Sequence, residues 1–239
     1  MKEEDVPRVA VITGASRGLG LALTRVLADR DWHLIVDARD AAALEGALRG
    51  LPTYGAVEAV AGDITDPRHR TALAAAVDRA GRLDAVVLNA GTLGPSPLPP
   101  LVDLVLDELD RTFHVNVTAQ LALVQALLPR LPDGGRILAI TSDAAREGYA
   151  GWGAYGATKA ALEQLMNVLV AEHPRLRIHR VDPGDVRTQM HQDAFPGEDI
   201  SDRPEPDVAV PGLLRLLEEE LPSGRWQAQE LNLAPADTR

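Results

Sequence analysis

The stretch RVAVITGASRGLG, residues 8–20, decides how the chain folds. Its first half is a short apolar run rich in β-branched residues, typical of a buried strand, and a helical pattern follows over 19–30. Gly14, Gly18 and Gly20 permit a tight turn and a close approach of the backbone to a ligand. The start of the helix offers free N–H groups and a positive dipole end, so this unit favours a phosphate-binding site. It is no P-loop, because no Gly-Lys-Ser/Thr sequence follows the glycines.

The same alternation of apolar runs and helical patterns continues along the chain. Strands are expected at RVAVIT (8–13), HLIVDA (33–38), AVEAVA (56–61), DAVVLNA (84–90), RILAIT (136–141), RIHRVD (177–182) and near 225–230. Helices are expected at 19–30, 41–50, 67–80, about 101–131, 156–172 and 208–221. This order predicts an α/β fold with one doubly wound parallel sheet of about seven strands and helices on both faces. We expect a single domain over 8–232, with tails at 1–7 and 233–239.

Two segments differ from the short joints between these elements. TLGPSPLPP (92–100) is rich in proline and is not expected to form regular structure. The polar stretch over about 184–207 is too long for a simple connection, and loops of this length are often lids or disordered segments. We therefore expect a substrate loop or lid over 184–207.

Composition argues against several classes of function. The 239-residue chain carries a formal net charge of −11, which repels nucleic acid and anionic membranes, so neither is expected as a partner. No apolar run reaches the roughly 18–20 residues of a membrane span, and the acidic start MKEEDVP is no secretory signal. The absence of cysteine fits a reducing cytoplasm. The six histidines lack metal-ligand spacing, so no metal is expected.

The stretch GWGAYGATKAAL, residues 151–162, contains an unusual lysine. Of the 24 lysines and arginines, only Lys2 and Lys159 are lysines. Lys159 follows Tyr155 by four residues, which places both on one face of a helix. An ammonium near a phenol lowers the phenol pKa, and an arginine fork is no substitute for that point charge. Such a pair arises by chance in roughly one chain in 40, so it indicates a site only together with other motifs.

Six motifs together make the chain resemble the single-domain branch of the short-chain dehydrogenase/reductase family over nearly its whole length. They are TGASRGLG (13–20), Asn-Ala-Gly (89–91), Asn116, Ser142 at the family's distance before the tyrosine, the Tyr155/Lys159 pair, and Pro183-Gly184 followed by Val186 and Thr188. The resemblance implies a Rossmann-type fold, a nicotinamide dinucleotide cofactor, and hydride transfer between a carbonyl and a secondary alcohol.

The resemblance also implies four catalytic residues. Ser142, at the carboxyl end of an expected strand, donates a hydrogen bond to the substrate carbonyl, and Tyr155 acts as the general acid or base. Lys159 lowers the pKa of Tyr155 and holds the nicotinamide ribose, while Asn116 anchors a water that links Lys159 to solvent. Taken singly, each has a structural alternative: Ser142 as a turn hydroxyl, Asn116 as a satisfied buried amide, and Tyr155 as a core aromatic.

Cofactor-binding residues implied by the resemblance come from six segments. They are Gly14, Ser16, Arg17, Gly18, Leu19 and Gly20; Ala38 and Arg39; Asp63 and Ile64; Asn89, Ala90 and Gly91; Tyr155 and Lys159; and Pro183, Gly184, Val186 and Thr188. Asp63 and Ile64 are placed at the adenine ring, although this segment also suits a helix N-cap region ahead of Pro67. In the family, the residue matching Asn89 stabilises the sheet more often than it touches the ligand, and Gly91 lets the backbone pass close to the cofactor.

The choice between NADP(H) and NAD(H) rests on LIVDARD, residues 34–40. A carboxylate after the second strand binds the ribose 2′-hydroxyl of NAD, whereas a cation there binds the 2′-phosphate of NADP. The family's NAD-selecting carboxylate aligns with Ala38, which leaves room for a phosphate that Arg39 and Arg17 can hold. A register slip of one residue would bring Asp37 to the ribose instead. Strand alternation turns Asp37 to the opposite face, so NADP(H) is preferred, with NAD(H) as the alternative.

The substrate is expected to be a small carbonyl or alcohol compound that the sequence does not identify. Expected pocket walls lie at 92–100, 143–152 and 184–207, with apolar side chains from Tyr149, Trp152, Met190 and Phe195. Two other functions stay open. One is non-redox acid/base catalysis by a cyclase, dehydratase or isomerase, and the other is a dinucleotide-binding regulator on the same fold.

The resemblance also bears on the assembly of subunits and on the mouth of the pocket. The segment 101–131 and the helix that carries Lys159 resemble those that pack between subunits in the family, so a homodimer or homotetramer is expected. The C-terminal sequence SGRWQAQELNLAPADTR lacks the family's frequent Gly-Gly segment, which often contributes to the interface and closes the pocket. Asp143, directly after Ser142, is more polar than the family suggests and is placed at the pocket mouth.

Overall fold

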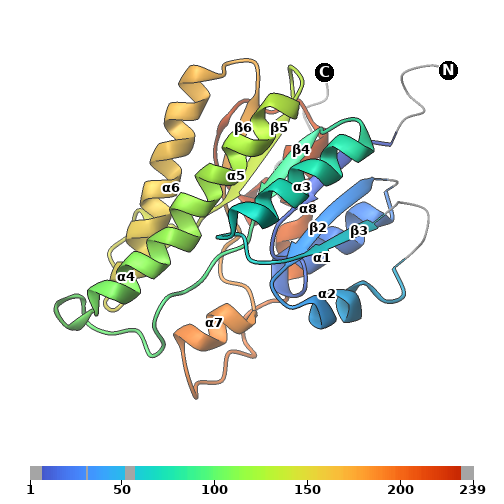
Figure 1. The fold of residues 1–239 in the computed structure, drawn as a ribbon. Helices are drawn as coiled ribbons and strands as arrows, with labels where there is room; N and C mark the ends of the chain where they lie inside the picture. Colours follow the sequence, from blue (N-terminus) through green and yellow to red (C-terminus); the bar gives the residue numbers. More distant parts are fainter. Residues whose placement is uncertain (1–6, 31, 52–56, 233–239) are drawn as a thin grey trace.

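The computed structural model describes residues 7–30, 32–51 and 57–232. In these ranges, seven parallel strands form one sheet in the order β3-β2-β1-β4-β5-β6-β7 (Figure 1). The strands are β1 (Val9–Ile12), β2 (His33–Ala38), β3 (Val57–Ala61), β4 (Ala85–Leu88), β5 (Arg136–Ile140), β6 (Arg177–Asp182) and β7 (Gly224–Gln227). The doubly wound α/β prediction is confirmed, whereas the expected tails lie almost wholly outside the described residues.

The helices follow the predicted order with some changes in extent. They are α1 (Gly18–Ala28), α2 (Ala41–Leu48), α3 (Pro67–Ala80), α4 (Leu106–Phe113), α5 (Ala119–Leu127), α6 (Gly153–Glu172), α7 (Gln189–Ala194), α8 (Val210–Glu218) and α9 (Ala228–Leu231). The segment expected as one helix over 101–131 begins with a 3₁₀ turn at Leu101–Asp103 and is continuously helical only from Leu106, with a π-helical turn at His114–Thr118 joining α4 to α5. The last strand ends at Gln227 because Ala228 and Leu231 turn into the core beside α8.

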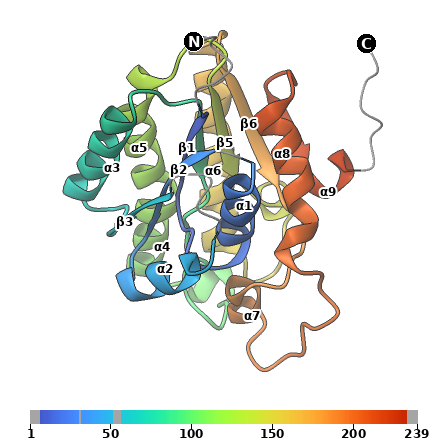
Figure 2. The same ribbon diagram turned by 90° about the vertical axis from the view of Figure 1, so that its right-hand side faces the viewer.

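Side-chain alternation along the strands divides the core into two layers. Figure 2 shows the helices that cover the two faces of the sheet. Ala10 and Ile12 of β1 belong to the layer formed with α1 and α8. Val9 and Val11 belong to the opposite layer, which is formed with α3, α5 and α6. Because both faces of each central strand are covered, these strands read as continuous apolar runs.

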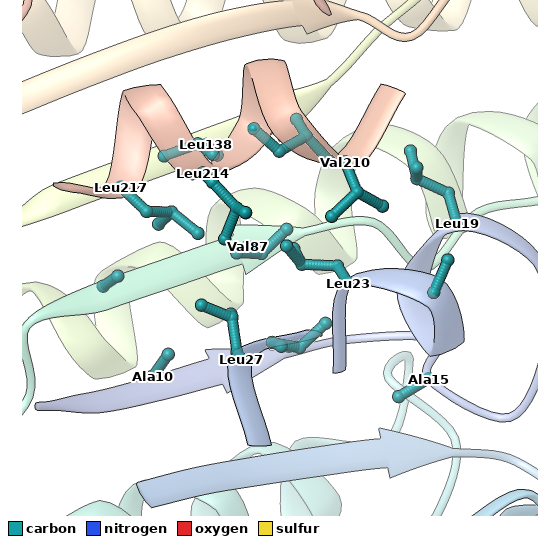
Figure 3. Packing of buried hydrophobic residues seen from close by; sticks show 14 of the residues in the cluster. Ala10, Ala15, Leu19, Leu23, Leu27, Val87, Leu138, Val210, Leu214 and Leu217 are labelled. Carbon is teal, nitrogen blue, oxygen red and sulfur yellow. The ribbon is translucent and has the colours of Figure 1, made fainter. Parts of the chain in front are cut away.

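Helices α1 and α8, far apart in sequence, pack side by side over one face of the sheet (Figure 3). Leu23 and Leu27 of α1 join Leu214 and Leu217 of α8 in the apolar layer above Val87. Each of these leucines is buried, which contributes roughly 1.5–3 kcal/mol relative to an exposed side chain. This packing fixes the position of α1 on the sheet, and therefore also the position of the glycine turn at its N-terminus.

At the neighbouring strands β1 and β4, the connections that leave the carboxyl ends of the strands run to opposite faces of the sheet. The helix after β1 covers one face and the helices after β4 cover the other. Open α/β sheets bind ligands at the carboxyl ends of such strands. The side-chain amide of Asn89 donates to the backbone carbonyl of Thr13 (2.8 Å), and Thr13 Oγ1 accepts the N–H groups of Asn89 and Ala90 (3.0 and 2.9 Å). These bonds join the two strand ends at the crevice.

The two unusual loops pack together above this edge. The segment expected as a lid contains α7, and Ser96 Oγ of the proline-rich loop donates to the carbonyl of Asp193 in α7 (2.6 Å). Met190 and Phe195 from the same segment pack with Tyr155 in a small apolar cluster. The 184–207 segment therefore includes regular structure and packs against the proline-rich loop and the cluster around Tyr155.

One prediction about stability follows from His179 on β6. It is fully buried, its Nδ1 accepts from Trp226 Nε1 at 3.1 Å, and burial lowers its pKa to about 4. The unfolded chain takes up this proton near pH 6.5. The stabilisation is therefore complete above about pH 6.5 and is lost as the pH falls toward 4. We expect the free energy of unfolding to fall by about 2 kcal/mol from this group between pH 7 and pH 5.

Urea unfolding followed by tryptophan fluorescence at both pH values checks this expectation. His179→Gln should reduce the loss, whereas His114→Gln, at an exposed position, should not. An unchanged pH dependence in His179→Gln would show that this buried imidazole does not control acid stability.

Candidate active site

A cavity of about 810 Å³ lies along the carboxyl ends of the central strands. Its size falls within the range of small-molecule and cofactor sites. All of the sequence-predicted site residues line it except Gly20 and Asn116. Within the described ranges, no helix has the length and apolar character needed to cross a bilayer. Nor do the described histidine, aspartate and glutamate side chains form a group of three or more that could hold a metal ion.

The glycine turn has the shape that a dinucleotide phosphate requires. Gly14 and Gly18 adopt φ values of +71° and +57°, and a Cβ on Gly18 would lie 3.3 Å from Thr188 Cγ2. A Cβ on Gly20 would lie 2.4 Å from the carbonyl oxygen of Gly14, so this glycine permits packing behind the cavity. Arg17 occupies the N-cap of α1 and makes no side-chain capping bond. The first-turn N–H groups therefore lack a side-chain cap where a phosphate would bind.

Asp37 supports this turn from below. Its buried carboxylate accepts the N–H of Gly14 at Oδ1 (2.8 Å) and lies 3.0 Å from His69 Nε2 at Oδ2. His69 comes from α3 and packs over Gly62, where a Cβ would lie 2.3 Å from its Nδ1. Both oxygens of Asp37 are thus engaged within the protein. Sequence analysis missed His69, whose only signal is the glycine opposite it.

Ala38 and Arg39 lie at the open end of the cavity beyond Asp37. Arg39 and Arg17 are both exposed, and neither forms an ion pair with a described residue. Two guanidinium groups thus flank a small residue at this end. The arrangement suits an anionic group.

Asp63 and Ile64 line the same end of the cavity. Asp63 Oδ1 accepts the N–H and the hydroxyl of Thr65 (2.8 and 2.7 Å). Partial burial raises the pKa of Asp63, but these hydrogen bonds outweigh it, so the pKa lies below its ordinary value. The N-cap of α3 is Asp66, which accepts the N–H of Arg68 at 2.8 Å. The helix cap and the cavity wall are therefore formed by different aspartates.

Ser142, Tyr155 and Lys159 converge on the opposite wall. Ser142 follows β5, and α6 carries the other two side chains. Lys159 Nζ donates to the carbonyl of Ile140 (2.8 Å) and lies 5.5 Å from the centroid of the Tyr155 ring. Both Tyr155 and Lys159 are buried, at 8% and 5% exposure. The lysine therefore lies beneath the phenol ring and is held by the end of the strand.

The electrostatics of Tyr155 differ from the expectation that Lys159 lowers its pKa. Burial raises the pKa of Tyr155 well above its ordinary value, and the carboxylates of Asp182 and Asp143 add to the increase. Burial also lowers the pKa of Lys159 to about 8. The pKa of Tyr155 is raised because desolvation disfavours the charged phenolate, just as it disfavours the charged ammonium of Lys159. The ammonium of Lys159 is also bonded to a backbone carbonyl. Tyr155 is consequently a protonated phenol near neutral pH.

Asn116 lies behind the cavity in the π-helical turn between α4 and α5. Its Oδ1 accepts the N–H of Thr92, and its Nδ2 donates to the carbonyl of Thr92 (2.8 Å each) and to Thr158 Oγ1 (3.0 Å). A Cβ on Gly91 would lie 3.2 Å from Asn116 Oδ1. The Asn116 side chain thus positions the strand-end loop beside Lys159.

A buried ionic network that sequence analysis missed anchors Ser142. Glu163, one turn after Lys159 on α6, accepts Thr141 Oγ1 (2.6 Å) and Arg225 Nε (2.8 Å). Arg225 of β7 also donates to the backbone carbonyl of Ser142 (3.1 Å). The only sequence signal for this network was Glu163 on the helix face that packs against the sheet. Nothing in the sequence indicated that Arg225 would be its partner.

The remaining walls are mainly apolar. Trp152 lies edge-on to Tyr155, with ring centroids 5.7 Å apart, and 6.1 Å from the ring of Phe195. Met190, Trp152 and Phe195 line the cavity, as does Tyr149, which is 46% exposed. Asp143 also lines it and accepts hydrogen bonds from Ser142 and Tyr149. This end can enclose a hydrophobic molecule next to one carboxylate.

Comparison with known proteins agrees with this geometry. A family model for short chain dehydrogenases matches residues 8–199. The chain is 37% identical over 198 residues to an (S)-benzoin-forming benzil reductase from Saccharomyces cerevisiae, covering 78% of this chain and 74% of that protein. It is 36% identical over 191 residues to a 1-deoxy-11-beta-hydroxypentalenate dehydrogenase from Streptomyces avermitilis, covering 77% of this chain and 70% of that protein.

Solved structures are similar over nearly the whole chain. A short chain dehydrogenase from Shigella flexneri complexed with NADP has a TM-score of 0.86 and 30% identity, covering 95% of this chain and 100% of that one. An alcohol dehydrogenase from Thermococcus sibiricus complexed with 5-hydroxy-NADP has a TM-score of 0.82 and 28% identity, covering 92% and 95%. The match to the family model and the similarity of these relatives show that the chain belongs to the short-chain dehydrogenase/reductase family.

Proposed function

We propose that this oxidoreductase uses NADP(H) to interconvert a carbonyl and a secondary alcohol on a hydrophobic small molecule. The observation that carries the proposal is the convergence of Ser142, Tyr155 and Lys159 on one wall of the cavity that the glycine turn opens into. A regulator that only binds a dinucleotide has no need of a buried phenol and a buried ammonium at this wall. The same residues would provide the acid/base groups for the reaction.

The glycine turn and the carboxyl ends of the strands would hold the dinucleotide. When bound, it supplies a hydride to the carbonyl carbon and is itself oxidised. The phenol of Tyr155 donates its proton to the carbonyl oxygen, so that one hydride and one proton complete the alcohol. Ser142 orients that oxygen, and Lys159 holds the cofactor ribose from beneath the phenol.

The protonated state of Tyr155 suits it to the role of proton donor in carbonyl reduction. Because burial raises its pKa, Tyr155 is protonated at neutral pH and ready to act as an acid. Alcohol oxidation requires the phenolate, which burial and the nearby Asp182 and Asp143 disfavour. Lys159 remains mostly charged at pH 7, because burial lowers its pKa only to about 8.

The lining supports a bulky aromatic or alicyclic substrate. Trp152, Phe195 and Met190 enclose the space beside Tyr155. One relative is named for the reduction of benzil, an aromatic diketone, and another for the oxidation of a pentalenate. Both names describe ring compounds, the first neutral and the second bearing a carboxylate. The cytoplasm remains our proposal for where the reaction takes place, on the absence of cysteine.

NADP(H) is the proposed cofactor because of the charges at the end of β2. Ala38 leaves space, Arg39 and Arg17 flank it, and Asp37 is engaged by Gly14 and His69. A ribose 2′-phosphate would meet two cations and no free carboxylate from β2. The NADP-bound structures of relatives support the same choice.

A homodimer or homotetramer is proposed from an exposed apolar cluster ahead of α4 and at its start. Leu101, Val102, Val105 and Leu106 are 69%, 93%, 60% and 72% exposed. It is unusual for a monomer to expose four large apolar side chains so near one another in the sequence, and such a cluster is typical of an interface. They lie in the segment expected to pack between subunits.

Tyr155→Phe should lower kcat for ketone reduction by about 10²–10⁴-fold, because the proton donor is removed. Lys159→Arg should also impair turnover, because a planar fork does not reproduce the buried ammonium on the Ile140 carbonyl. Steady-state assays at 340 nm measure both effects. Circular dichroism and NADPH titration serve as controls for fold and cofactor binding of Tyr155→Phe. Near-normal turnover of Tyr155→Phe would show that another group supplies the proton.

Cofactor choice is tested by the ratio of kcat/KM with NADPH to that with NADH. We expect a ratio of at least about 100, which needs only about 2.7 kcal/mol and is within the reach of two charged hydrogen bonds. Arg39→Ala should lower the ratio, whereas Arg49→Ala, at an exposed position outside the cavity, should leave it unchanged. A native preference for NADH would contradict the proposed clamp.

Assembly is tested by light scattering at micromolar protein concentration. We expect an oligomer for the native protein and dissociation for the double variant Val102→Glu/Leu106→Glu, because buried carboxylates would oppose an apolar contact. Val208→Glu, at another exposed apolar position, is the matched control. A native monomer would refute the proposed interface.

A further inference from the structure

Asp143 is held in one position at the substrate end of the cavity. Its Oδ1 accepts the hydroxyl of Ser142 (2.9 Å) and the N–H of Ala144 (2.7 Å), and its Oδ2 accepts the hydroxyl of Tyr149 (2.9 Å). The bond to Asp143 raises the pKa of Tyr149, so Tyr149 donates at neutral pH. The carboxylate is thus fixed directly beside the serine that contacts the reacting oxygen.

The carboxylate of Asp143 is not neutralised by an ion pair with a described residue. Among the ion pairs within the described ranges, none includes Asp143. Two more carboxylates, Asp182 and Asp185, line the cavity, while its arginines come from the glycine turn and the end of β2. Both arginines that line the cavity thus belong to the segments expected to bind the cofactor, and neither pairs with Asp143. A substrate carboxylate here would meet an uncompensated like charge.

The bond between Ser142 and Asp143 also limits what Ser142 can do. A serine hydroxyl has one proton to donate, and here that proton is directed at the carboxylate. A simple ketone must draw the proton away from a charged acceptor to gain a hydrogen bond from Ser142. A hydroxyl or ammonium on the adjacent carbon could instead donate to Asp143 Oδ1, which would free the Ser142 proton for the carbonyl oxygen.

We propose that Asp143 is a specificity-determining residue that excludes carboxylate-bearing substrates and favours ketones with a hydroxyl or ammonium donor on the carbon next to the carbonyl. This inference rests on the proposed ketone reductase activity and narrows its substrate class. For the reverse direction it selects the corresponding vicinal diols or amino alcohols. Asp143 acts on the choice among substrates, while Tyr155 and Lys159 serve every one of them.

Three aryl ketones of similar size test the proposal with NADPH. Benzoylformate carries a carboxylate, acetophenone carries no polar neighbour, and 2-hydroxyacetophenone carries a hydroxyl donor. In Asp143→Asn, kcat/KM for benzoylformate relative to acetophenone should rise at least tenfold. The advantage of 2-hydroxyacetophenone over acetophenone should fall several-fold. Comparing ratios between enzyme forms cancels the intrinsic reactivity of each ketone.

Two further variants separate charge from geometry. Glu147→Gln removes the same charge from an exposed position outside the cavity, and its substrate ratios should match the native ones. Tyr149→Phe removes the clamp on Oδ2 but keeps the carboxylate, so benzoylformate should remain rejected. An Asp143→Asn variant that changes kcat/KM for all three ketones by one common factor would overturn the proposal, because Asp143 would then only support Ser142.

Calorimetric binding of the same ketones to the enzyme loaded with NADP⁺ distinguishes failure of this inference from failure of the proposed function. Binding in the order set by Asp143, without reduction of any ketone, would sustain the inference and refute the reductase. Reduction with substrate ratios that are independent of Asp143 would refute the inference alone. Absence of both binding and reduction would refute both.

Discussion

The hydrogen bonds between the ends of β1 and β4 are the constraint on which the site depends. The amide of Asn89 bonds to the carbonyls of Thr13 and Gly14 (2.8 and 3.2 Å), and the Thr13 hydroxyl accepts two N–H groups in return. Because the connections after these strands run to opposite faces of the sheet, their ends diverge and leave a crevice. The cross-strand bonds fix the width of that crevice, and thus the separation of the glycine turn from the wall that carries Tyr155.

Burial explains both the lone internal lysine and the chemistry assigned to it. Lys159 is 5% exposed and bonds to the Ile140 carbonyl, a place that a compact ammonium fits and a guanidinium does not. The same burial raises the pKa of Tyr155 and keeps the phenol protonated. Desolvation therefore determines the protonation state of the acid, and the space beneath the ring determines why the cation is a lysine. Glu163 and Arg225 complete the wall from behind by holding the serine segment in place.

Much of the fold was predictable because the signals are local. Apolar runs marked six of the seven strands, the last strand was expected near 225–230 without such a run, and the glycine turn, Ser142, Tyr155 and Lys159 followed from short motifs. The pairing of Asp37 with His69, and of Glu163 with Arg225, joins residues far apart in sequence and has no local signature. The π-helical turn at His114–Thr118 and the helix inside the expected lid were also missed, because helical periodicity does not distinguish a π turn and a polar loop pattern does not reveal one short helix. The pKa of Tyr155 was predicted in the wrong direction, since sequence shows a neighbouring charge but not the loss of water.

The most direct test of the account is the fate of the cofactor hydrogen. The protein is incubated with an aromatic 1,2-diketone and NADPH that carries deuterium at both C4 positions of the nicotinamide ring, and the product is analysed by mass spectrometry and NMR. The account predicts one deuterium at the new carbinol carbon for each NADPH oxidised, and a loss of this transfer in Tyr155→Phe. Conversion of the ketone without deuterium in the product, or without consumption of NADPH, would contradict it and indicate non-redox acid/base chemistry at the same residues.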